Sequence, residues 1–170
     1  MNTVVLTSAT YVSLIKSHDE RIFINDVLAI PHHCFLNALY NKQNAYANKE
    51  LKIVIGSLGI GKKDPFYEYG NPHWSKVEDF RKAPGMYDIH VWLEDIDGNI
   101  YDVVITVIHY VAVIKNKSIS FKDNEIIAGK SREQCERAGL FYVEASKEIS
   151  HAVLQEYIEL NQTMLQLLNI

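Results

Sequence analysis

The sequence predicts an α+β fold with a mostly antiparallel sheet, and three observations support this. An Asp-Gly turn at residues 96–99 separates two apolar runs, which is typical of a β-hairpin. Apolar residues recur at helical spacing over residues 33–47 and again over 146–168. The elements follow in the order helix, strand, hairpin, helix, strand, helix, and 170 residues suit a single domain over residues 1–170.

The first half of the chain predicts one helix and one strand. Pro31 ends whatever precedes it, because the residue before a proline avoids the helical region. The helix follows over residues 33–47, on the apolar positions Phe35, Leu36, Leu39 and Tyr40. Residues 51–55 form a compact run rich in β-branched residues, which predicts a strand. Residues 56–85 hold three of the four prolines and predict a long irregular stretch that covers a site or carries function.

The second half predicts the hairpin and two more helices. Its strands cover residues 89–95 and 100–114, and we interpret the Val- and Ile-rich part, 103–114, as a buried strand. Ser131 and Gln134 form a capping box at the start of a short helix, which Gly139 ends. A strand over residues 140–143 then precedes the final helix, 146–168.

Composition excludes several classes of protein. Hydrophobic residues make up 48% and charged residues 22%, which excludes intrinsic disorder. A net charge of −4 argues against a nucleic-acid partner, and residues 103–114 are too few to span a membrane. No basic segment precedes an apolar one at the N-terminus, so we expect a cytoplasmic protein whose Cys34 and Cys135 are free thiols.

Two motifs suggest ligands that we do not expect. Residues 56–63 approach the phosphate-binding P-loop pattern, but Lys63 replaces the hydroxyl that would bind magnesium, so we interpret them as a glycine-rich turn. His32, His33 and Cys34 are adjacent and point in different directions, whereas zinc ligands are spaced so that they converge. We therefore expect no cofactor and no metal.

Cys34 lies just inside the N-terminus of the first predicted helix. The unpaired N–H groups and the helix dipole at such a position stabilise a thiolate and lower the pKa of the thiol. The same N–H groups can accept a developing oxyanion. A single cysteine is more often a buried core residue than a nucleophile, so this position needs a second observation.

The hairpin supplies that observation, provided that its loop has three residues, with Gly98 in the left-handed conformation of a G1 bulge. Asp95 then pairs with Asn99, and His90 and Asp102 become diagonal neighbours on one face of the sheet. A two-residue loop would place them on opposite faces. The polar face of a solvated hairpin is the alternative that involves no chemistry.

These residues resemble a known superfamily. A helix-start cysteine in Pro31-His-His-Cys34-Phe-Leu-Asn-Ala38, then a strand, then H-x-W-x(5)-G-x(3)-D, looks like a papain-like cysteine hydrolase of the transglutaminase-like branch. The resemblance covers residues 31–107. It implies a sheet packed against an N-terminal catalytic helix, with Cys34 as nucleophile, His90 as general base and acid, and Asp102 as orienter of the imidazole.

The resemblance leaves the oxyanion donor open. Asn25 is the nearest upstream side-chain amide, and the backbone N–H of Cys34 is the other donor. We expect the Cys34 sulfur within about 4 Å of a His90 ring nitrogen. We interpret Cys135 as structural, and His109 as a core residue of a strand.

The resulting expectation is a cysteine-dependent hydrolase or acyl transferase. It would act on a peptide, an isopeptide or a glutamine side-chain amide through a thioester, with a protein or peptide as substrate. The alternative is a binding or inhibitor protein on a papain-like scaffold without turnover. Its surface would be the aromatic segment 66–74 or the apolar face of the last helix.

Overall fold

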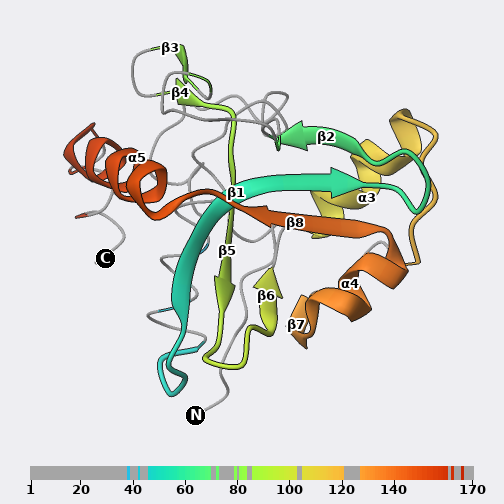
Figure 1. Ribbon diagram of the computed structural model, residues 1–170, viewed down its shortest axis with the longest axis horizontal. Helices are drawn as coiled ribbons and strands as arrows, with labels where there is room; N and C mark the ends of the chain where they lie inside the picture. The colour runs from blue at the N-terminus through green and yellow to red at the C-terminus, as the bar shows by residue number, and fades with distance from the viewer. Residues whose placement is uncertain are drawn as a thin grey trace.

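The computed structural model describes residues 38, 42, 46–69, 72, 79, 81–83, 86–102, 105–120, 127–160, 162 and 166. Within them lies a six-stranded sheet in the order β2-β1-β5-β6-β7, with β8 pairing with β1 (Figure 1). The strands are β1 Lys52–Ile60, β2 Phe66–Tyr69, β5 His90–Glu94, β6 Ile100–Asp102, β7 Ile127–Lys130 and β8 Leu140–Glu144. Every one of these pairings is antiparallel, which confirms the predicted sheet.

The helices whose bounds the described residues define are α3 Ile105–Ile114, α4 Arg132–Ala138 and α5 Lys147–Leu160. Figure 1 shows α5 at one side of the long, curved β1 strand, with α3 and α4 at the other side. A separate pair of short strands, β3 Arg81–Ala83 and β4 Met86–Tyr87, forms a second small sheet. No helix in the described part of the chain has the length and apolar character to cross a membrane.

The main core is shared by the sheet, α3 and α4. Its buried side chains are Val54, Leu58, Ile60, Trp92, Ile100, Ile108, Val111, Ala112, Ile127, Cys135, Leu140 and Tyr142. The α5 helix buries Ile149, Val153 and Tyr157, which are four residues apart and therefore share one helical face. The predicted final helix is thus confirmed over the residues of α5.

The predicted strand over residues 103–114 is wrong. The β6 strand ends at Asp102, and Ile105–Ile114 forms α3, so His109 belongs to a helix. Ile108, Val111 and Ala112 are buried, at the i, i+3 and i+4 spacing of one helical face. A continuous apolar run has no periodicity that separates a strand from a buried helix, and packing here overrides the strand preference of Val and Ile.

The predicted glycine-rich turn at residues 56–63 is wrong for residues 56–60, which belong to β1, whereas residues 61–63 lie in the loop that connects β1 to β2. β1 runs through Gly56 to Ile60, and β2 begins at Phe66, so the predicted irregular stretch begins with paired strands. A Cβ on Gly59 would lie 2.9 Å from the Tyr67 ring. The glycines therefore serve close contacts within the sheet. The described residues that come directly after this segment lead into the β2 strand, whereas a P-loop would open a helix there.

The short helix α4 has the predicted ends. The Gln134 backbone N–H donates to the Ser131 side chain, the Gln134 side chain accepts from the Ser131 backbone, and Gly139 is left-handed at φ 94°. The N-terminal helix predicted over residues 33–47 lies largely outside the described residues, although Ala38 and Lys42 are helical.

The α4 cap provides a first prediction. Ser131→Ala is expected to lower the free energy of unfolding by about 1 kcal/mol, because it leaves a helix N–H without its acceptor. Urea denaturation measures this loss. Ser120→Ala is the control, since Ser120 is exposed and lies outside the helices and strands. Equal stability of the two variants would contradict the prediction.

Candidate functional site

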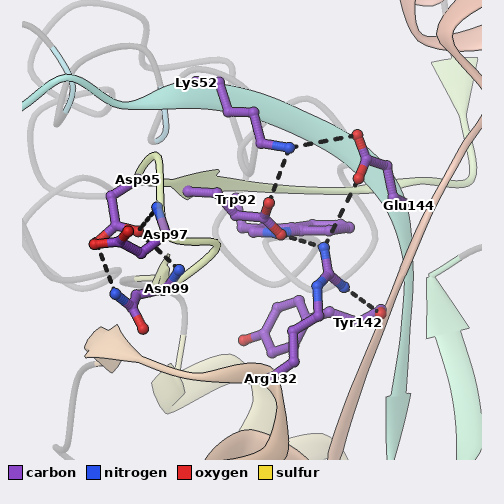
Figure 2. A network of polar contacts seen from close by, with 9 residues as sticks. Lys52, Trp92, Asp95, Asp97, Asn99, Arg132, Tyr142 and Glu144 are labelled. Atoms are coloured by element: carbon purple, nitrogen blue, oxygen red, sulfur yellow. Dashed lines mark hydrogen bonds and ion pairs between the residues drawn. The ribbon is translucent and has the colours of Figure 1, made fainter.

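The turn of the β5–β6 hairpin has the predicted geometry. Asp95 N–H donates to the Asn99 carbonyl at 3.1 Å, Gly98 N–H donates to the Asp95 carbonyl at 3.0 Å, and Gly98 has φ 79°. The Asp95 carboxylate accepts hydrogen bonds from Asn99 and from the Asp97 backbone (Figure 2). These bonds, the Asn99 side chain first, hold the pKa of Asp95 below its ordinary value. The three-residue loop is therefore confirmed.

This turn places His90 and Asp102 in contact. The register pairs Glu94 with Ile100 and Leu93 with Tyr101, which is the predicted alignment. His90 Nε2 lies 2.6 Å from Asp102 Oδ2, and the two side chains are 0% and 2% exposed. A carboxylate at this distance fixes the orientation of the imidazole and stabilises its protonated form. The structure thus brings together two of the three predicted site residues.

A third residue, Tyr142 on β8, joins the pair and was not predicted. Its hydroxyl donates to Asp102 Oδ2 at 2.8 Å. Burial, followed by the charge of Asp102, raises the pKa of Tyr142 well above its ordinary value, so the phenol remains a donor. Tyr142 lies forty residues from Asp102 along the chain, and no motif in the sequence connects the two.

Aromatic rings pack around the pair. The Trp92 ring stacks on His90 with 5.9 Å between centroids and 19° between planes. The Tyr142 ring meets Trp92 edge-on at 5.1 Å. Trp92 is 1% exposed, so its ring packs beside the histidine in the interior of the protein. These aromatic rings keep water away from the pair, which strengthens the hydrogen bond between His90 and Asp102.

A second buried carboxylate, Glu94, lies farther along β5 and is 2% exposed. It accepts a hydrogen bond from Trp92 Nε1 at 3.0 Å and pairs with Lys52 at 3.0 Å and with Arg132. Glu144 approaches the same two cations, at 3.7 and 3.9 Å, as Figure 2 shows. The burial of Glu94 and Asp102 is inconsistent with the polar face of a solvated hairpin.

A pocket of about 560 Å³ lies beside the hairpin turn. Its lining includes Lys42, Lys52, Glu94 and Asp95, so it opens onto the ion pairs of Glu94. Neither His90 nor Asp102 lines it. The described residues contain no group of three or more His, Cys, Asp or Glu side chains able to hold a metal ion.

Of the two cysteines, only Cys135 lies among the described residues. Cys135 on α4 is fully buried, and this burial raises the pKa of its thiol to about 12, which suits a structural residue. Cys34 and Asn25 lie outside the described residues, as do His32 and His33. The contact of Cys34 with His90 stays a prediction.

Comparisons with protein-family models, with curated proteins and with solved structures find no match for this chain. The candidate site is therefore defined by its own residues: His90, Asp102 and Tyr142 in contact, with Cys34 as the predicted nucleophile.

Proposed function

We propose that this protein is a cysteine-dependent hydrolase or acyl transferase, acting through a thioester on a peptide, an isopeptide or a glutamine side-chain amide. The observation that carries the proposal is the buried 2.6 Å contact between His90 and Asp102. Burial of an ionisable pair costs free energy unless the pair is well bonded, and such pairs concentrate at functional sites.

His90 serves as base and acid, and Asp102 orients it. Because Asp102 accepts from Nε2, the neutral ring carries its proton there, and Nδ1 is the nitrogen that accepts a proton from the nucleophile. Cys34, at the start of the predicted N-terminal helix, supplies that nucleophile. A free thiol of this kind requires a reducing compartment, which favours the cytoplasm.

The reaction has two halves. The Cys34 thiolate attacks the amide carbon, the oxyanion is held by the Cys34 backbone N–H or by Asn25, and the C–N bond breaks as His90 protonates the leaving amine. A thioester remains. Water or a second amine then attacks the thioester carbon and gives its proton to His90, and the C–S bond breaks to regenerate the thiolate. No cofactor or metal enters this scheme.

Alkylation of the two cysteines tests the proposal. Treatment with iodoacetamide at pH 7 should modify Cys34 at least about 100-fold faster than Cys135, since one thiol is ionised and the other is buried with a pKa near 12. Mass spectrometry of the digested protein measures both rates.

His90→Gln is the matched variant, because it removes the ring that pairs with the thiolate. It should slow the modification of Cys34 at pH 7 by about tenfold or more and leave Cys135 unchanged. A Cys34 that reacts no faster than an ordinary thiol, with or without His90, would contradict the proposal and favour a binding protein without turnover.

A further inference from the structure

The Asp102 carboxylate accepts two hydrogen bonds at a single oxygen. His90 Nε2 lies 2.6 Å from Oδ2, and the Tyr142 hydroxyl lies 2.8 Å from the same atom. The two donors come from β5 and β8, which flank β1. Rotation of the carboxylate would lengthen at least one of these bonds, so the two donors together restrict its orientation.

Tyr142 is held through its backbone carbonyl and through its ring. Arg132 on α4 donates to the Tyr142 backbone carbonyl at 2.7 Å and also pairs with Glu94. The ring is 7% exposed, and it contacts Trp92 at 5.1 Å and His90 at 5.9 Å between centroids. A hydroxyl on so constrained a ring has little freedom to leave Asp102.

We propose that Tyr142 is a positioning residue whose hydroxyl orients Asp102 and sets the basicity of His90. The inference rests on the proposed function in so far as His90 is the catalytic base. A hydroxyl that donates to a carboxylate lowers the basicity of that carboxylate and therefore weakens its hold on an imidazolium. Loss of the hydroxyl should then make His90 more basic.

Two described groups that interact electrostatically with Asp102, Tyr46 and Cys135, do not obscure a titration of His90. Burial raises the pKa of both Tyr46 and Cys135, which keeps these side chains neutral near pH 7. Neither of these two side chains therefore changes its charge while His90 titrates.

The test uses the full chain with ¹³C-labelled histidine, followed by NMR against pH, with the His90 signal assigned through His90→Gln. Tyr142→Phe keeps the ring and removes the hydroxyl, and it should raise the pKa of His90 by about half to one unit. Tyr46→Phe is the matched control. Its buried hydroxyl has no hydrogen-bond partner in the described part of the chain, so its loss should leave the His90 pKa nearly unchanged.

A second variant should change the His90 pKa in the opposite direction. Incorporation of 3-fluorotyrosine at position 142 makes the phenol more acidic and a stronger donor, so the His90 pKa should fall. If Tyr142→Phe folds and the His90 pKa stays constant, the proposal is overturned. If Tyr142→Phe does not fold, the fluorinated chain decides, and a constant or raised His90 pKa overturns the proposal.

The alkylation of Cys34 separates this inference from the proposed function. Where both hold, the pH at which Cys34 reactivity falls should shift with the His90 pKa in the same variants. Slow alkylation in every variant, together with the expected NMR shifts, would contradict the proposed function and leave the link between Tyr142 and His90 intact.

Discussion

Cys34→Ala is expected to abolish acyl transfer, with a loss of at least about a thousandfold, because no other group in the proposed site forms the thioester. Cys34→Ser should be nearly as inactive, since a hydroxyl ionises far less readily than a thiol paired with a histidine. The assay uses a mixture of glutamine-rich peptides as the substrate. It measures released ammonia, which reports attack on side-chain amides, and new α-amino groups, which report peptide cleavage.

Two further variants control this result. Asp102→Ala should be milder than Cys34→Ala, because orienting the imidazole contributes less than supplying the nucleophile. Cys135→Ala should keep full activity. Because Cys135 is fully buried in the core, Cys135→Ala should lower the free energy of unfolding by about 1 kcal/mol. Full activity in Cys34→Ala with an unchanged melting temperature would favour a binding protein instead.

Gly56→Ala is expected to cost about 3 kcal/mol or more of stability. Gly56 pairs with His90 on one side and with Glu144 on the other, so it lies between β5 and β8. A Cβ there would lie 2.0 Å from the Val143 carbonyl oxygen and 2.8 Å from Trp92 Cη2. Because the first of these atoms belongs to the backbone, the strands would have to separate.

Gly98→Ala is the matched control for this variant. Gly98 needs a left-handed backbone at φ 79°, but a Cβ there meets no atom within 4 Å. Gly98→Ala should therefore lower the free energy of unfolding by about 1 kcal/mol, because alanine disfavours this backbone conformation. Thermal and urea denaturation of both variants measures the difference. A Gly56→Ala protein as stable as Gly98→Ala would contradict the close packing of β1 against β8.

The hairpin and the α4 cap show how far local sequence predicts this protein. Asp95, Gly98 and Asn99 determine the turn, the turn determines the register, and the two-residue period of a strand then brings His90 to Asp102. The α4 helix likewise depends on Ser131, Gln134 and Gly139, which interact within a few residues. In both cases the interacting groups are close along the chain, so their geometry follows from backbone rules alone.

Contacts between distant segments were decided only by tertiary structure. Whether Ile105–Ile114 forms a strand or a helix depends on which faces the rest of the core covers, and its apolar sequence is compatible with both. Glycine at position 56 is explained only by the approach of Val143 from β8. Tyr142 reaches Asp102, and Arg132 reaches Glu94, across 40 and 38 residues. Nothing in the spacing of such pairs marks them, because packing of separate elements brings them together.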